Sequence, residues 1–372
     1  MFFLFDYSKY YSYIILLVIV CIVLYNDDYI VSANGGRNII LRDNETVPAL
    51  IMFGDSIVDP GNNNYLKTIV KCNFPPYGRD FQGGNPTGRF CNGKIPSDYI
   101  AEEFGLKELL PAFLDPSLQP QDLLTGVSFA SGGSGYDPLT PAIVSVLSLT
   151  DQLELFKRYL ARVDSSFGKE ATANILSKAI FLVCSGSDDI ANTYFSTPFR
   201  RAHYDINSYT DLVVSSASSF IQQLYGVGAR RIGVFSLPPI GCVPSQRTLG
   251  GGLNRECSNK ANQAALLINS KLNVQLNSLR KKLPGSKLVY VDIYNPLLSL
   301  IKNPAQYGFE VANRGCCGTG NIEVSILCNS LDDSKSCPDA SKYIFWDSYH
   351  PSEKAYEVLS PLILSKCIRE FF

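Results

Sequence analysis

The sequence predicts an α/β protein built as a three-layer α/β/α sandwich around a mainly parallel sheet. Short apolar runs that end in polar loops alternate along the chain with longer segments of helical periodicity. This alternation is typical of parallel sheets covered by helices on both faces, and such sheets bind ligands beyond the carboxyl ends of their strands. The 372 residues can bury a large core, and no linker or repeat divides them. We therefore predict a single domain over residues 34–372.

Four short apolar runs have the length and composition of strands that are buried on both faces. These runs are residues 49–53, 179–184, 232–235 and 288–291, and residues 126–130 are a weaker fifth candidate. Polar residues follow each of the four runs at once, and the first run leads into Gly54-Asp55-Ser56. The polar loops are therefore expected to meet at one edge of the sheet.

Helical periodicity fills the segments between the predicted strands. Apolar residues recur at helical spacing from Leu149 to Leu160, behind a start signal at Thr150 and Asp151. Further helices are predicted over residues 210–225, closed by Gly226, over 265–279 and over 356–363. The remaining long segments, 59–96 and 303–342, are rich in Gly, Pro and Cys and are predicted to be surface loops that disulfides staple and that shape a cleft.

The charge balance argues against a nucleic-acid partner. The chain has 33 basic and 34 acidic side chains and contains no long basic run.

The N-terminus of the chain carries an apolar run, residues 13–25, that is shorter than the roughly 20 residues of a bilayer span. Small residues at Val31 and Ala33 predict a signal peptide over residues 1–33, although Lys9 is offset by Asp6 and leaves a signal anchor open. We expect a secreted protein of the cell wall or cell surface, with no membrane span after cleavage.

Export predicts oxidised cysteines. Removal of Cys21 with the signal peptide leaves ten cysteines, of which several should form disulfides. A zinc site is the alternative for Cys316, Cys317, Cys328 and Cys337, but their spacing matches no paired C-x-x-C pattern and no histidine lies among them. The sequon Asn44-Glu45-Thr46 predicts one N-glycan, at Asn44.

Two histidines remain after residue 33, and one of them has a carboxylate partner. His203 lies in a polar segment with no partner pattern and is interpreted as a surface residue. Asp347 precedes His350 by three residues, so that its carboxylate can fold back onto the imidazole, the commonest general base near neutral pH. The alternative is that Asp347 only caps the helix that follows.

Ser56, at the end of the first predicted strand, is the candidate nucleophile. The preceding Gly54 permits a tight turn, and Ser56 can present its own backbone N–H to a developing oxyanion. The alternative is a serine that caps the next helix. Ser56 and His350 together are a stronger signal than either alone, because both must reach the same edge of the sheet.

These residues lie in segments that resemble the plant GDSL esterase/lipase family, a branch of the SGNH hydrolases. The resemblance is carried in order by residues 53–62 (FGDSIVDPGN), 86–90 (PTGRF), 129–135 (FASGGSG), 237–244 (LPPIGCVP) and 345–351 (FWDSYHP). Residues 187–194 (SDDIANTY) are similar to the extracellular lipases of plant surfaces. The resemblance implies a flavodoxin-like five-stranded sheet and a Ser56-His350-Asp347 triad that hydrolyses lipid or acyl esters through an acyl-enzyme, without a metal or organic cofactor. It implies no obligate protein partner.

The resemblance also implies an oxyanion hole formed by the N–H of Ser56, a glycine N–H and a side chain of the third block. Gly132 fits the glycine position, with Gly133 as the alternative register. The third block departs from the family because Asp188 replaces an Asn, and an ionised carboxylate there would repel an oxyanion. Asp188 is protonated, or it turns away, or activity is impaired; the intact triad favours the first two. A non-catalytic binding protein on the same scaffold and an acyltransferase therefore stay open as alternative functions.

Overall fold

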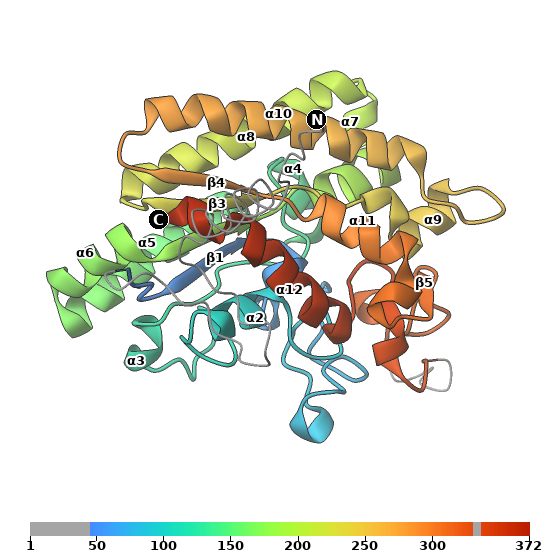
Figure 1. The fold of residues 1–372 in the computed structure, drawn as a ribbon, viewed down its shortest axis with the longest axis horizontal. Coiled ribbons are helices and arrows are strands. Elements are labelled where there is room, and N and C mark those ends of the chain that lie inside the picture. The colour runs from blue at the N-terminus through green and yellow to red at the C-terminus, as the bar shows by residue number, and fades with distance from the viewer. Residues whose placement is uncertain (1–44, 330–335) are drawn as a thin grey trace, which may run out of the picture. The chain divides into compact units, whose positions relative to one another are not determined.

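Four parallel strands form the central sheet in the order β1-β2-β3-β4 (Figure 1). They are β1 (Leu50–Gly54), β2 (Ile180–Cys184), β3 (Arg231–Phe235) and β4 (Lys287–Val291). The computed structural model describes residues 45–329 and 336–372, and its unit from Thr46 onward carries all of these strands. The four predicted strands are confirmed. β1 and β2 are buried at every position, as expected for a sheet covered on both faces.

The weaker fifth candidate runs beside β1 on the side away from β2. The N–H of Met52 donates to the carbonyl of Val127 at 3.2 Å, and the N–H of Phe129 donates to the carbonyl of Met52 at 2.8 Å. The segment does not form a full strand, and isolated parallel bridges join Ser128 to Met52 on one side and to Ala112 on the other. When this segment is included, five segments can be numbered in chain order, with residues 126–130 as the second. Their order across the sheet is then 2-1-3-4-5, which is the flavodoxin-like arrangement.

Helices cover both faces of the sheet and complete the three layers (Figure 1). One face carries α5 (Leu149–Phe167), α8 (Ile206–Val227) and α10 (Asn259–Lys282), and the other carries α2 (Pro96–Glu103) and α12 (Glu353–Cys367). The remaining helices are α3 (Pro120–Leu123), α4 (Leu139–Val144), α6 (Lys169–Lys178), α7 (Pro198–Arg201), α9 (Pro244–Gly250) and α11 (Tyr294–Lys302).

Successive side chains along each strand point to opposite faces of the sheet, so each strand contributes to both layers of helices. Phe53 of β1 makes edge-on ring contacts with Phe156 of α5 and Phe220 of α8, at centroid distances of 5.6 and 5.5 Å. Ile180 and Leu182 of β2 instead line a small cavity with residues of α2 and α12. The apolar runs are therefore continuous because each strand packs against helices on both sides.

The predicted helices are confirmed, although their ends differ from the expected ones. The side chain of Ser148 caps α5 and accepts the N–H of Asp151 at 3.1 Å, so the start lies before Thr150. The helix expected to close at Gly226 continues to Val227 and is capped by Gly228. Packing of Leu224 and the rest of the apolar face extends the helix past a single glycine.

The two long segments differ in how they are held. The segment 303–342 contains β5 (Val311–Gly315), which pairs in parallel with β6 (Tyr343–Phe345). It also contains the disulfides Cys316–Cys337 and Cys317–Cys328, and a third disulfide joins Cys242 to Cys257. The four sulfurs considered for zinc are thus bonded in pairs, which excludes the zinc alternative.

The segment 59–96 is not stapled by disulfides, contrary to the expectation. Its Cys72 and Cys91 are both buried thiols, and polar contacts hold the segment instead. The buried guanidinium of Arg89 contacts both carboxylate oxygens of Asp98 in α2, at 2.8 and 2.7 Å. This bidentate geometry fixes the loop against α2.

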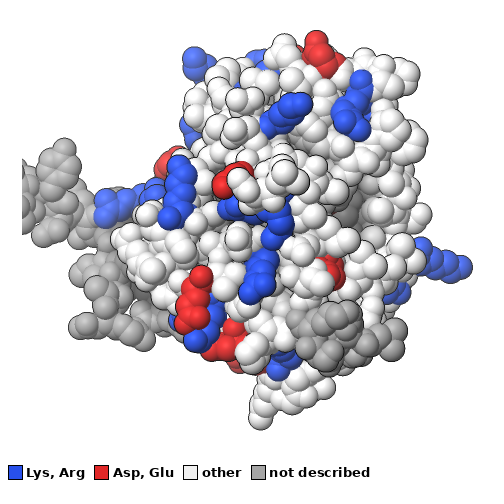
Figure 2. Space-filling model, turned by 90° about the vertical axis from the view of Figure 1, so that its right-hand side faces the viewer, with Lys and Arg blue, Asp and Glu red and all other residues white. Residues whose placement is uncertain are grey.

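The predicted signal peptide, residues 1–33, and the predicted glycosylation site, Asn44, lie outside the described residues. Within the residues that are described, no helix is long and apolar enough to cross a membrane. On the face drawn in Figure 2, Lys and Arg side chains are scattered with Asp and Glu side chains among them, in keeping with the balanced composition.

Candidate active site

The first strand ends in a sharp turn that presents Ser56. Gly54 has a φ of +140°, and a Cβ on it would lie 1.8 Å from the carbonyl oxygen of Cys184 in β2. Gln152 of α5 holds Gly54 from the other side, accepting its N–H at 2.8 Å and donating to its carbonyl at 2.9 Å. The side chain of Asp55 then caps a short 3-10 turn, Ser56–Val58, by accepting the N–H of Ile57 at 3.1 Å. Asp55, and not Ser56, is therefore the residue that caps this turn. The hydroxyl of Ser56 contacts another residue.

That partner is His350. Ser56 Oγ lies 2.6 Å from His350 Nε2, and His350 Nδ1 lies 2.9 and 2.8 Å from the two carboxylate oxygens of Asp347. Ser352, not Asp347, caps α12 by accepting the N–H of Ala355. The structure therefore brings Ser56, His350 and Asp347 into one chain of contacts, although 294 positions separate the first two in the sequence.

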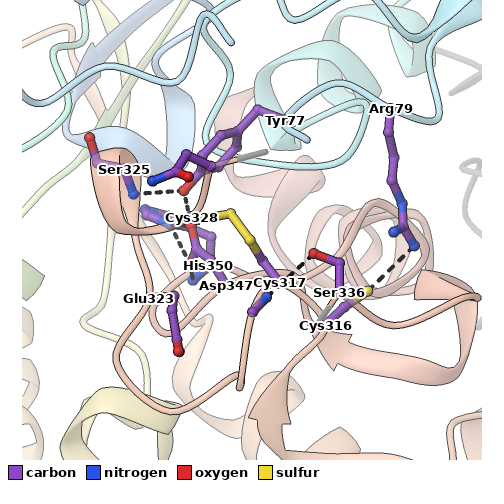
Figure 3. Close-up of a disulfide and its surroundings, with 12 residues drawn as sticks. Tyr77, Arg79, Cys316, Cys317, Glu323, Ser325, Cys328, Ser336, Asp347 and His350 are labelled. Atoms are coloured by element: carbon purple, nitrogen blue, oxygen red, sulfur yellow. Dashed lines mark hydrogen bonds and ion pairs between the residues drawn. A yellow bond between two sulfur atoms is a disulfide. The ribbon is translucent and has the colours of Figure 1, made fainter. Parts of the chain in front are cut away.

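Asp347 is fully buried, and several donors surround its carboxylate. The backbone N–H groups of Tyr349 and His350 each donate to Oδ1 at 2.8 Å, and the hydroxyl of Tyr77 donates to Oδ2 at 2.9 Å (Figure 3). Donors of this kind stabilise the ionised carboxylate. The arrangement fixes the carboxylate that faces the imidazole.

Ser56 and His350 open onto a largely apolar cavity of about 480 Å³. The ring of Phe90 packs beside His350 at a centroid distance of 5.3 Å. Among the other lining residues are Val70, Ile143, Leu249, Leu297, Ile322 and Leu359. The site therefore joins a polar reacting end to an apolar chamber, as ligand sites commonly do.

Gly132 is placed differently from the expectation. Its N–H donates to Oδ2 of Asp59 at 3.0 Å, while Oδ1 of the same carboxylate accepts the N–H groups of Gly61 and Asn62. The Gly132 amide is thus engaged within the loop, and it is Gly133 that lies on the cavity wall. Because the Gly132 amide already has an acceptor, Gly133, the alternative register, is the glycine that faces the cavity.

Asp188 lies on the cavity wall with Ser56 and His350. Its carboxylate accepts a hydrogen bond from the side-chain amide of Asn192 at 2.5 Å, and the carbonyl of that amide accepts the hydroxyl of Tyr349 at 2.9 Å. Burial raises the pKa of Asp188 from 3.8 to about 6, although the charge on His350 and the hydrogen bond from Asn192 lower it. Asp188 is therefore mostly ionised at pH 7 and protonated in mildly acidic solution.

Two neighbouring carboxyls also resist ionisation. Burial, with a contribution from Asp188, raises the pKa of Asp55 well above its ordinary value, and one of its carboxyl oxygens has no hydrogen-bond partner among the described residues. Burial raises the pKa of Asp189 to about 7. A site rich in desolvated carboxyls is typical of functional positions.

Sequence reasoning missed three residues of this site: Tyr77, Asn192 and Gln152. Tyr77 lies in a long loop, and no sequence signal connects it to Asp347. Asn192 stands four positions after Asp188, a spacing that could have indicated a contact within a helical turn. His203 is exposed, as expected of a surface residue.

Comparisons with known proteins identify the family of the chain. The family described as GDSL-like Lipase/Acylhydrolase matches residues 50–363. The chain is 58% identical to the GDSL esterase/lipase EXL3 of Arabidopsis thaliana over 325 residues, which are 87% of this chain and 89% of that protein. It is 50% identical to the GDSL esterase/lipase EXL2 of Arabidopsis thaliana over 331 residues, 85% and 87% of the two chains.

Among solved structures, a catalytic mutant of the acetylxylan esterase Axe2 from Geobacillus stearothermophilus is similar at a TM-score of 0.41 and 13% identity, covering 88% of this chain and 95% of that one. The match to the family spans most of the chain and includes Ser56, His350 and Asp347. The chain therefore belongs to the GDSL-like lipase/acylhydrolase family of carboxylic-ester hydrolases.

Proposed function

We propose that this protein is a secreted serine esterase/lipase that uses Ser56 as nucleophile, His350 as general base and Asp347 as the acid that orients His350. The observation that carries the proposal is the unbroken contact from Ser56 Oγ through His350 to the buried carboxylate of Asp347. This is the geometry by which a hydroxyl, weakly nucleophilic on its own, is activated by an adjacent base.

In the proposed reaction, Ser56 Oγ attacks the ester carbonyl carbon while His350 Nε2 takes the hydroxyl proton. The tetrahedral intermediate collapses to an acyl-enzyme, and His350 returns the proton to the alcohol that leaves. Water then attacks the acyl-enzyme by the same steps, which release the carboxylic acid and restore Ser56. Asp347 stays ionised throughout and stabilises the charged imidazole.

The oxyanion is proposed to face the backbone N–H groups of Ser56 and Gly133. Gly133 lines the cavity that contains the hydroxyl of Ser56, which supports this pair over Gly132. Asp188 completes the hole only when it carries a proton. When it is ionised, it opposes the developing negative charge, and two backbone donors remain.

The walls of the cavity support a lipophilic acyl ester as substrate. Apolar side chains dominate the lining, and some of them reach the surface: Leu249, Ile322 and Ile143 are 65, 49 and 39% exposed. An apolar chain gains free energy when it leaves water for such a surface. The natural ester is therefore proposed to carry its reacting carbonyl at the end of an apolar chain.

Secretion to the cell wall or surface is supported by the N-terminal apolar run and by three disulfides, which persist in oxidising compartments. A signal peptide over residues 1–33 and a glycan on Asn44 are part of this proposal. Mass spectrometry of the protein recovered from plant culture medium would detect a mature N-terminus near residue 34 and a glycopeptide that contains Asn44.

Turnover of p-nitrophenyl esters of increasing chain length tests the proposed activity. We expect hydrolysis by the wild-type protein and loss of at least about 10³-fold in Ser56→Ala. Ser177→Ala, on the surface of α6, is the matched control and should keep full activity. Equal turnover by the wild type and Ser56→Ala would reject the assignment of Ser56.

The same assay separates the two alternative functions. A well-folded wild-type protein that hydrolyses no ester and still binds one would be a binding protein on this scaffold. Addition of short alcohols during turnover would reveal an acyltransferase, because the acyl group would then appear in a new ester instead of in the free acid.

A further inference from the structure

We propose that Tyr77 is a positioning residue for the catalytic acid, and that the loop closed by the Cys317–Cys328 disulfide holds Tyr77 in place. The proposal rests on the proposed function, because it assigns Tyr77 a role through Asp347. Tyr77 comes from the long segment 59–96 and is fully buried between that segment and the loop (Figure 3).

The hydrogen bond between Ser325 and Tyr77 has only one possible direction. The backbone N–H of Ser325 lies 2.7 Å from the hydroxyl oxygen of Tyr77, and an N–H can only donate. The single hydroxyl proton of Tyr77 points to Oδ2 of Asp347, at 2.9 Å, because a carboxylate accepts more strongly than the neighbouring thiol of Cys72. Ser325 thus orients the hydroxyl, and the hydroxyl orients the carboxylate.

The disulfide loop is attached directly to the segment that carries the catalytic acid. The N–H of Cys317 donates to the carbonyl of Trp346 at 2.7 Å, and the N–H of Ser348 donates to the carbonyl of Glu323 at 2.9 Å. The Cys317–Cys328 bond closes the loop that contains both anchoring residues, Cys317 and Glu323. The side chain of Ser325 also bonds to the backbone of Ile69 and Lys71. Opening the disulfide would therefore loosen Ser325 under Tyr77 without releasing it.

The loop also forms part of the cavity wall through Ile322 and Val324. Its effect on substrate binding must therefore be separated from its effect on Asp347. Binding by the wall changes KM, whereas a change at Asp347 alters the protonation of His350 and hence the pH profile.

The other titratable groups around this contact leave the pH profile interpretable. Burial raises the pKa of Tyr77, Cys72, Cys91 and Tyr356 well above their ordinary values, so these groups stay neutral below pH 9. Nearby carboxyls include Asp59, near Cys72, Asp55 and Asp188, on the Ser56 side of His350, Glu353, near Cys91, and Glu323 in the disulfide loop. Substitution of Tyr77 leaves all of them in place.

The test is Tyr77→Phe, which removes only the hydroxyl. Without this donor the carboxylate of Asp347 attracts the imidazolium more strongly, so the acid limb of the kcat/KM profile should move up by about half a pH unit or more. We expect kcat/KM at the optimum to fall about tenfold, as for a lost hydrogen bond to a charged group. The control is Tyr159→Phe, which removes a buried hydroxyl that donates to the carbonyl of Leu123 and should leave the profile unchanged.

A double-mutant cycle tests the role of the loop. Cys317→Ser with Cys328→Ser should lower kcat/KM and move the acid limb in the same direction as Tyr77→Phe. Adding Tyr77→Phe to that variant should cause a smaller shift than Tyr77→Phe causes in the wild type, because the contact is already weakened. Circular dichroism and thermal melts establish whether each variant is folded. If the cysteine variant does not fold, the result for Tyr77→Phe alone tests the proposal.

An unchanged acid limb in a folded, active Tyr77→Phe protein would overturn the proposal, as would additive shifts in the cycle. Failure of the proposed function looks different: the wild-type protein itself would then hydrolyse no ester and would not react with a fluorophosphonate at Ser56.

Discussion

At the scale of single residues, Asp188 departs from the Asn that the resemblance to the family implies at this position. A carboxylate replaces a neutral amide beside the proposed nucleophile. The structure shows how the charge is accommodated, because Asn192 donates to Asp188 and burial brings its pKa to about 6. The carboxyl therefore changes its charge near pH 6.

Asp188→Asn should raise ester turnover at neutral and alkaline pH. Above pH 6 the wild-type carboxyl is mostly ionised and repels the oxyanion, whereas Asn is neutral and donates a hydrogen bond. We expect an increase of up to about tenfold at pH 8 that shrinks below pH 6, where the wild-type group is protonated. The measurement is kcat for both proteins between pH 5 and 8.5.

Asp211→Asn, at an exposed carboxylate of α8, serves as the control for a general change of charge. A lower rate for Asp188→Asn at every pH would mean that the carboxylate assists the reaction, and our account of this position would then be wrong.

The residue types of the proposed triad were predictable, since each stands beside a distinctive neighbour in the sequence. The partners of those residues were not. Tyr77 reaches Asp347 across 270 positions of the chain, and Gln152 reaches Gly54 across 98. Contacts of this kind depend on how the loops and helices pack, which local patterns do not encode.

At the scale of elements, the close approach of β1 and β2 explains why the strand ends where it does. Gly54 sits against the carbonyl of Cys184 with a positive φ, so a side chain would both clash and strain the backbone. The turn that follows sets the direction of Ser56.

Gly54→Ala should destabilise the protein by more than about 4 kcal/mol or prevent folding, because the new Cβ would lie 1.8 Å from a backbone oxygen that cannot move without breaking the sheet. Gly168→Ala is the matched control. Gly168 has a φ of +84° and a ψ of 171°, and no atom of the described residues lies within 4 Å of the position that its Cβ would take. This substitution should therefore cost only the backbone strain, about 1–3 kcal/mol. Urea unfolding measures both. A similar small loss in the two variants would contradict the packing argument.

The strands were predictable because burial on both faces leaves a continuous apolar run. The fifth segment gave a weaker signal for a structural reason, since it bonds to β1 on one side and, at Ser128, to residues 111 and 113 on the other. The short strands β5 and β6 were not predicted, because Asn313 and Arg314 are exposed and β5 lacks an apolar run.

At the scale of the whole molecule, several carboxyls are buried in the unit that holds the site. Burial raises the pKa of Asp59 and Asp188 to about 6 and that of Asp189 to about 7. Their unfolded counterparts ionise near 3.8, so the folded state binds more protons between these values. The stability that these groups contribute is present at low pH and is lost as the pH rises through 6 to 7.

The melting temperature should therefore fall between pH 4.5 and 7, by on the order of 5 °C, and should level off above pH 7. Asp188→Asn removes one of the three groups and should make this fall smaller. Differential scanning calorimetry in buffers of constant ionic strength measures both proteins. A melting temperature that is constant or rises over this range would show that these carboxyls are not held in the neutral form.

The central claim is that Ser56 is a nucleophile activated by His350. The most direct measurement is the reaction with a fluorophosphonate, followed by peptide mapping of the adduct. We predict a single adduct on Ser56 in the wild-type protein and a labelling rate reduced by at least about 10³-fold in folded His350→Ala. An adduct on another serine, or equal labelling rates in the two proteins, would contradict the account.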